Sequence, residues 1–334
     1  MKKRLLPLFF VTAFSLTACG GKSYSPKDYM LELDYTGQFK ILQLTDTHIA
    51  DKDDQDLHYA FLDLLIKDAN KANDLDFIVI TGDLFTFAGR TTARKYFDFF
   101  DSYKIPWSVV FGNHDEQTYF SVGWMTSELN RRSESANSYC MFKDIQDDDV
   151  QGNCNFAINL KKAGVVTDQL IMMDSNRYNF GDYFGYDYFK KDQIKWYEDL
   201  VDQTATDNGG VVNSLMFYHI PLFEINDAYE KGTVIYDGRN GAGDGKREDC
   251  CPPDINSGFF DVIKAKGSTK AMFFGHDHIN TFETDYEGVK FCYGIKSTNR
   301  IYYDEDLLGY QTIEIQDDHS LKIERSFHTY EEVK

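Results

Sequence analysis

Continuous hydrophobic runs recur along the chain, and each is followed by polar residues. They cover residues 39–44, 77–80, 107–111, 170–173, 215–218 and 271–274. Runs of this length that do not alternate with polar residues are typical of strands buried on both faces of a sheet. We therefore predict that these segments form the central strands of the fold.

Segments with helical spacing of apolar residues lie between several of these runs. Residues 57–69 place Leu57, Phe61 and Leu64 on one face, and residues 91–103 and 192–204 have the same periodicity. Helices that alternate with buried strands predict a layered α/β fold.

After residue 278 the apolar residues alternate more with polar ones. Residues 289–293, 310–315 and 321–327 are predicted to be antiparallel strands that complete a second sheet. Because no linker-like stretch separates residue 27 from the C-terminus, we expect a single folded domain.

Polar residues of the kinds that bind metals follow the apolar runs within about three residues. The motifs are Asp46-Thr47-His48, Gly82-Asp83, Gly112-Asn113-His114-Asp115, His219 and Gly275-His276-Asp277-His278. In open α/β sheets, ligands bind beyond the carboxyl ends of the strands. The motifs are therefore predicted to meet at one edge of the fold.

The side chains of these motifs suit a pair of metal ions. Two carboxylates, one amide oxygen and four imidazoles can hold two cations about 3.5–4 Å apart, with one carboxylate shared between them. Nitrogen and oxygen ligands without thiolate suit Mn, Fe, Zn or Ni and do not select among these metals. Such a pair favours in-line displacement at phosphorus. We predict a dinuclear phosphoric ester hydrolase whose nucleophile is a hydroxide that bridges the metals.

In order and type, the motifs resemble those of the calcineurin-like metallophosphoesterase superfamily, and the resemblance covers residues 39–315. It implies a four-layer α/β/β/α sandwich of two mixed β-sheets flanked by helices. It also implies two ligand sets that share Asp83. One metal would be bound by Asp46, His48, Asp83 and His278, and the other by Asp83, Asn113, His219 and His276.

The resemblance also implies roles for two residues that are not metal ligands. His114 would protonate the leaving oxygen or stabilise the transition state, and Asp115 would orient the His114 imidazole. Within the superfamily, residues 173–278 look most similar to the purple-acid-phosphatase-like branch. Purple enzymes have a metal-binding tyrosine where this chain has Thr86, and they lack the histidine that is present here as His48. Their ferric charge-transfer colour is therefore not expected.

The expected reaction is hydrolysis of a phosphomonoester, with a small phosphorylated molecule as substrate. A phosphodiesterase acting on nucleotides or lipid headgroups would use the same metals, so this alternative stays open. A solute-binding lipoprotein that has kept the fold without turnover is a third alternative. The pairing of His114 with Asp115 argues against it, because a protein that only binds a solute needs no proton donor.

The N-terminus has the pattern of a bacterial lipoprotein signal. Lys2, Lys3 and Arg4 precede an apolar stretch over residues 5–16, and Leu16-Thr17-Ala18-Cys19 resembles a lipobox. The apolar stretch is shorter than the ~20 residues that span a bilayer. We predict a signal peptide over residues 1–18, a tether over residues 19–36 with a lipid on Cys19, and a phosphoesterase domain over residues 37–334. The protein would be extracytoplasmic and anchored to a bacterial membrane.

The charge of the chain bears on its partners. The formal charge is −19, and without residues 1–18, which carry three cations and no acids, 32 cations face 54 acids. Nucleic acid is not an expected partner, because its binding depends on neutralising phosphates with Lys and Arg. A phosphorylated small molecule is still compatible, because surface carboxylates are screened beyond ~8–10 Å and the metals add local positive charge.

Two further features lead to weaker hypotheses. The glycine-rich segment 226–257 follows His219 and should lie over the metals, so Arg239, Lys246 or Arg247 is a candidate to grip the substrate. Outside the cytoplasm, Cys140 and Cys154 could close a small disulfide loop.

Overall fold

The computed structural model describes residues 24–144, 149–179, 181 and 184–334. The predicted signal peptide and Cys19 lie outside the described residues. Within the described ranges, no helix combines the length and the apolar character needed to cross a membrane.

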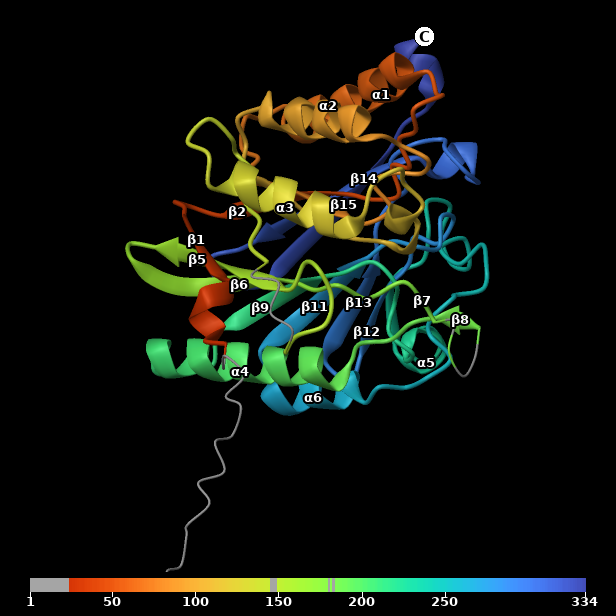
Figure 1. The fold of residues 1–334 in the computed structure, drawn as a ribbon. Coiled ribbons are helices and arrows are strands. Elements are labelled where there is room, and N and C mark those ends of the chain that lie inside the picture. Colours follow the sequence, from red (N-terminus) through yellow and green to blue (C-terminus); the bar gives the residue numbers. More distant parts are fainter. Residues whose placement is uncertain (1–23, 145–148, 180, 182–183) are drawn as a thin grey trace, which may run out of the picture.

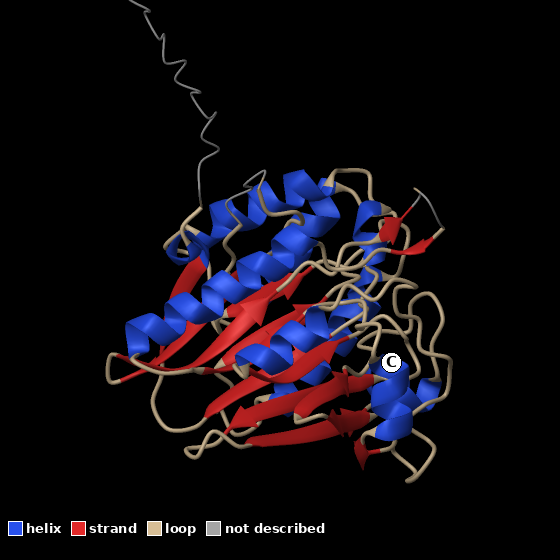
Figure 2. Ribbon diagram, turned by 90° about the horizontal axis from the view of Figure 1, so that it is seen from below, coloured by secondary structure: helices blue, strands red, loops and turns tan. Residues whose placement is uncertain are grey.

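Two mixed β-sheets pack against each other, and helices cover their outer faces (Figures 1 and 2). This arrangement confirms the predicted four-layer α/β/β/α sandwich. The eight-stranded sheet has the order β1 (Met30–Asp34), β5 (Phe156–Lys162), β6 (Val165–Met172), β9 (Asn213–Phe217), β11 (Thr269–Phe274), β13 (Val289–Tyr293), β12 (Glu283–Tyr286) and β10 (Thr233–Tyr236). The five-stranded sheet has the order β15 (Leu321–Phe327), β14 (Gly309–Ile315), β2 (Phe39–Leu44), β3 (Phe77–Thr81) and β4 (Trp107–Val110).

Helices form the outer layers, and each buries one apolar face. The five-stranded sheet is covered by α1 (Gln55–Ala69), α2 (Arg90–Asp101) and α3 (Val122–Ser133), and the eight-stranded sheet by α4 (Lys191–Asn208) and α6 (Phe259–Lys266). In α4, Ile194, Tyr197 and Leu200 are buried, and the helix ends at Gly209 in the left-handed conformation. The helices predicted over residues 57–69, 91–103 and 192–204 correspond to α1, α2 and α4.

Shorter elements complete the described chain. They are the helix α5 (Ile225–Lys231), the hairpin strands β7 (Tyr178–Asn179) and β8 (Gly185–Tyr186), and the 3₁₀ helices η1 (Pro26–Tyr29), η2 (Asn113–Glu116), η3 (Glu305–Leu307) and η4 (Tyr330–Val333). The hairpin and α5 lie at the same end of the eight-stranded sheet (Figure 1).

The strand pairing predicted after residue 278 is wrong in part. The strand β13 is parallel to β11 in the eight-stranded sheet, whereas β14 is antiparallel to β2 in the other sheet. β13 is also antiparallel to β12, and β14 to β15, so the antiparallel pairing is confirmed whereas the single common sheet is not.

The predicted boundary between tether and domain is also wrong. Residues of the expected tether form η1 and β1, and β1 pairs in parallel with β5. Tyr29 is buried, and its ring packs edge-on against Trp196 with the centroids 5.5 Å apart. The folded domain therefore includes residues well before residue 37, and β1 forms an edge strand of the larger sheet.

The disulfide that the spacing of Cys140 and Cys154 allowed is absent. Both side chains are buried free thiols. The Cys140 thiol lies against the Leu129 carbonyl, and the Cys154 sulfur accepts the backbone N–H of Phe111.

The topology brings the predicted motifs to one edge. In the smaller sheet β2, β3 and β4 are parallel neighbours, and in the larger sheet β9, β11 and β13 are parallel neighbours. Parallel strands place their carboxyl ends at the same edge of a sheet. The loops that follow these six strands therefore face one another across the two sheets.

Candidate metal centre

The seven predicted metal ligands converge between the two sheets. Asp46, Asp83 and Asn113 follow β2, β3 and β4, whereas His219 and His276 follow β9 and β11. All seven residues are buried, and the most exposed of them, His276, has an exposed fraction of 6%. Charged and polar groups at such depth require partners, because burial without them is costly.

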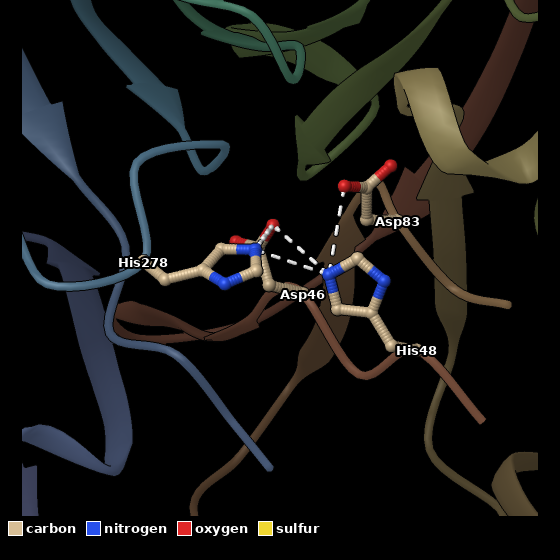
Figure 3. A group of neighbouring side chains, drawn as sticks. All are labelled: Asp46, His48, Asp83 and His278. Atoms are coloured by element: carbon tan, nitrogen blue, oxygen red, sulfur yellow. Dashed lines mark hydrogen bonds and ion pairs between the residues drawn. The ribbon is translucent and has the colours of Figure 1, made fainter. Parts of the chain in front are cut away.

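Four of these residues form a compact group (Figure 3). The ligand atoms of Asp46, His48, Asp83 and His278 all lie within 4.8 Å of one another. His278 Nε2 is 3.3 Å from Asp46 Oδ1, and His48 Nε2 is 3.6 Å from Asp83 Oδ2. The His48 and His278 Nε2 atoms are 3.1 Å apart. Facing nitrogens and carboxylate oxygens at these distances are the donors of a metal site.

The second predicted set is marked by buried polar atoms. Asp83 Oδ2, Asn113 Oδ1, His219 Nε2 and His276 Nε2 are buried, and the contact between Asp83 Oδ2 and His219 Nε2 at 3.2 Å is an ion pair only when His219 is protonated. A buried polar atom without a partner costs about 1–3 kcal/mol in a folded protein. These four atoms are the donors that the resemblance assigns to one metal, so the residues present fit a second cation.

Hydrogen bonds on the far side of the rings fix how the imidazoles face the centre. His219 Nδ1 donates to the Thr81 carbonyl and His278 Nδ1 to the Tyr302 carbonyl, both at 2.8 Å. Each ring therefore directs Nε2 at the centre and, when neutral, presents its lone pair there, as metal-binding histidines do.

Thr86 explains a departure from the purple enzymes. Its hydroxyl lies 2.9 Å from His48 Nδ1. Thr86, which stands where those enzymes have a tyrosine, therefore contacts a histidine of this centre. The Thr86 hydroxyl orients the His48 ring.

Asp83 lies between the two sets. Its Oδ1 accepts the backbone N–H of His114 at 2.8 Å, while its Oδ2 is 3.2 Å from His219 Nε2. The same Oδ2 faces His48, so it points toward both sets of ligands. A Cβ at Gly112 would overlap the Asp83 carboxylate, which explains the glycine before Asn113.

The backbone of the centre is strained. Asp46, His48, Asp83 and His276 have φ values of 54°, 46°, 50° and 80°, in the left-handed region that residues with a Cβ rarely occupy. Strain of this kind costs of order 1–3 kcal/mol per residue and persists at functional sites. Here it turns successive side chains of a loop toward the same point.

His114 lies at the edge of the centre and is half-buried. Its ring packs edge-on against His48 with the centroids 5.0 Å apart. Its Nδ1 is 2.8 Å from Gln117 Oε1, so Nδ1 donates to the amide and Nε2 is left for another partner. Gln117 was not among the predicted site residues. It is one turn beyond His114 in η2, a relation that the sequence could have suggested.

The prediction that Asp115 orients the His114 imidazole is wrong. Asp115 Oδ1 accepts the backbone N–H groups of Leu84 and Phe85, and Oδ2 accepts that of Gly112. The carboxylate is fully buried and faces away from the imidazole. Asp115 therefore holds together the loops that carry Asp83 and Asn113.

Charges inside the centre shift the pKa values of its histidines in opposite directions. Burial disfavours protonated His219, but the carboxylates of Asp83 and Asp46 outweigh it and raise its pKa to about 10. Burial and the neighbouring His219 charge together lower the pKa of His276 to about 3. Without metals, a proton on His219 therefore supplies part of the positive charge that the carboxylates need.

Lys296 is a buried cation beside the centre that the motifs did not predict. Its Nζ donates to the backbone carbonyl of Asp46 at 3.0 Å. Burial lowers its pKa to about 8, although Asp46 and Asp83 favour the charged form. It follows β13, the strand that was assigned to the wrong sheet, so its position could not be derived from the sequence.

The loop cations contact other residues of the chain, and the hypothesis that one of them grips the substrate stays a prediction. Arg247 pairs with Asp244 and Asp304, each at 2.6 Å. Arg239 donates to the Asp306 carbonyl, and the Lys246 ammonium lies 5.3 Å from the centroid of the Tyr229 ring. These contacts attach the loop to itself and to neighbouring segments of the chain.

The sequence matches the family model of the calcineurin-like phosphoesterases over residues 39–280. "Probable inactive purple acid phosphatase 29" of Arabidopsis thaliana is 27% identical over 293 residues, which cover 79% of this chain and 73% of that protein. "Phosphatase DCR2" of Saccharomyces cerevisiae is 29% identical over 204 residues, which cover 57% of this chain and 33% of that protein.

A solved structure has the same fold. A dimetal phosphatase from Danio rerio superposes with a TM-score of 0.53 at 14% identity, and the alignment covers 86% of this chain and 95% of that one. At this identity the likeness concerns the fold alone.

Proposed function

The chain belongs to the calcineurin-like phosphoesterase family, and on that premise we propose that this phosphoric ester hydrolase is a phosphomonoesterase for small phosphorylated molecules. The observation that carries the proposal is the group of four buried donor atoms next to the cluster of Asp46, His48, Asp83 and His278. "Phosphatase" in the names of the relatives supports a monoester. The word "inactive" is said of the plant proteins, and here the full set of donors is in place.

Each side chain has a task that follows from its position. Two divalent cations, when bound, would supply the activated water and the positive charge that phosphoryl transfer needs. Asp46, His48 and His278 would hold one cation, and Asn113, His219 and His276 the other. Asp83 would be shared between them, since its Oδ2 faces both sets and its Oδ1 accepts the N–H of His114.

His114 is proposed to serve the leaving group. The backbone bond to Asp83 and the bond between Nδ1 and Gln117 fix its ring relative to the centre. When the ring is protonated, Nε2 carries the only N–H that these bonds leave available. A donor so placed can give its proton to the ester oxygen as the bond to phosphorus breaks.

The proposal is tested by assaying residues 20–334 on 4-nitrophenyl phosphate and bis(4-nitrophenyl) phosphate, with added Mn²⁺ and with chelator. We expect chelator-sensitive hydrolysis with kcat/KM for the monoester at least about tenfold higher, a difference of ~1.4 kcal/mol in the barrier. A preference for the diester would favour the phosphodiesterase alternative. Absence of turnover on both esters, with two metals shown to be bound, would favour the solute-binding alternative.

Metal binding is expected to release a proton from His219. Its raised pKa of about 10 means that the metal-free protein keeps this proton at pH 7, whereas a metal ligand must be neutral. The metal affinity should therefore rise with pH, by about tenfold per pH unit for each proton released, and fall as the pH drops. Calorimetric titration at pH 7 in buffers of different ionisation enthalpy measures the release. A value near zero would contradict a protonated His219 in the metal-free protein.

A further inference from the structure

A cavity of about 590 Å³ lies beside the metal centre, on the side of His276. Tyr186 of β8 lines this cavity, and its ring meets the His276 ring edge-on with the centroids 4.3 Å apart. Cys251 also lines the cavity, and its backbone N–H donates to Asp277, the neighbour of His276, at 3.2 Å. The cavity therefore adjoins the centre at the contact between Tyr186 and His276. The volume is within the ~300–1,000 Å³ of small-molecule sites.

The walls of the cavity combine aromatic rings with carboxylates. Tyr186 and Phe223 contribute π faces, and Phe223 is 44% exposed although it is a large apolar residue. Asp227 and Asp254 contribute carboxylates. Among the described residues that line the cavity, none is Lys, Arg or His. Lys231 pairs with Asp227 at 2.8 Å but is not itself part of the lining.

This combination favours a cation. Aromatic faces attract ammonium groups through the ring quadrupole. Carboxylates add a Coulomb attraction, and the formal charge of −19 acts in the same direction. An anionic group would meet repulsion here from the carboxylates of Asp227 and Asp254.

We infer that this cavity receives the leaving alcohol of the substrate, and that this alcohol carries an alkylammonium group. The inference rests on the proposed function, because it places the phosphoryl group at the metal centre. Hydrolysis would break the bond between phosphorus and the alcohol oxygen, form one to the oxygen of water, and return a proton to the alcohol. The products would be inorganic phosphate and an amino alcohol.

Phosphocholine and 3,3-dimethylbutyl phosphate test the inference. The two esters have nearly the same shape, but a carbon replaces the charged nitrogen in the second. We expect kcat/KM to be about tenfold higher for phosphocholine, the order of size of a cation–π contact in a partly desolvated site. Asp254→Asn should lower the value for phosphocholine more than that for the neutral ester. Asp261→Asn, which removes a carboxylate on α6 that pairs with Lys264, is the matched control and should leave the ratio unchanged.

Binding of the two alcohols separates this inference from the proposed function. Choline and 3,3-dimethylbutanol are titrated by calorimetry into wild type and Asp254→Asn without any ester. Tighter binding of choline that weakens in Asp254→Asn supports the cavity assignment even if no phosphate ester is hydrolysed. Normal turnover of 4-nitrophenyl phosphate, with equal kcat/KM for the two test esters and equal binding of the two alcohols, would overturn the cavity assignment alone.

Discussion

Asp83→Asn is expected to lower kcat/KM for a phosphate monoester by about 10³-fold or more and to remove tightly bound metal. Asp83 Oδ2 faces both ligand sets, at 3.6 Å from His48 Nε2 and 3.2 Å from His219 Nε2. An amide in its place offers no negative charge and, with its carbonyl oxygen still accepting from His114, presents an NH₂ group to both cations. Loss of one group that holds two catalytic elements gives effects of this size.

The measurement is metal content by mass spectrometry together with kcat/KM, and the fold is checked by circular dichroism. Asp168→Asn is the matched control, because Asp168 is also a buried carboxylate, but it pairs with the surface histidine His319. This control should keep its metals and its activity. If Asp83→Asn kept near-normal turnover, the two-metal reading of the centre would be wrong.

The fold and the convergence of the motifs were predictable because both depend on patterns local to the sequence. Buried parallel strands show as continuous apolar runs, and the ligand of an α/β sheet lies beyond the strand ends. Asp46, Asp83 and Asn113 follow such runs, as does His219. Their meeting at one edge follows from the direction of the strands alone. The match to the family model supports the resemblance that was inferred from the motifs.

Features that depend on long-range pairing were not predictable. Lys296 lies beside Asp46 only because β13 pairs with β11, and the alternation of residues 289–293 did not indicate that partner. The strand β1 falls in the segment predicted to be a tether, and its position depends on pairing with β5 and on Tyr29 packing against Trp196.

Side-chain partners within a motif were also beyond the sequence. Asp115 is adjacent to His114 in the chain, yet three backbone N–H groups from neighbouring loops satisfy its carboxylate. A tight 3₁₀ turn instead brings Gln117 to the imidazole. Residues one position apart on such a turn point in different directions, so adjacency alone favoured the wrong partner.

His114→Ala is expected to lower kcat most for esters whose leaving group needs a proton. For alkyl phosphates the loss should be about 10²–10⁴-fold, the usual contribution of a positioned general acid. For 4-nitrophenyl phosphate it should be much smaller, because nitrophenolate leaves without protonation. The measurement is kcat across a series of esters of rising alcohol basicity, and His319→Ala on the surface is the control. Equal losses across the series would mean that His114 stabilises charge and donates no proton.

Gln117 variants then test whether the position of the imidazole matters. Gln117→Leu removes the acceptor of His114 Nδ1, so it should lower kcat for alkyl phosphates by about tenfold, the size of one lost hydrogen bond, and affect KM little. Gln117→Glu restores an acceptor and adds a negative charge that stabilises the protonated ring. Because a general acid must hold its proton, the alkaline limb of the pH–rate profile should move to higher pH in this variant. A residue that only supported the fold would lower activity without moving that limb. Such a result would mean that the loop backbone held by Asp115, and not Gln117, orients His114.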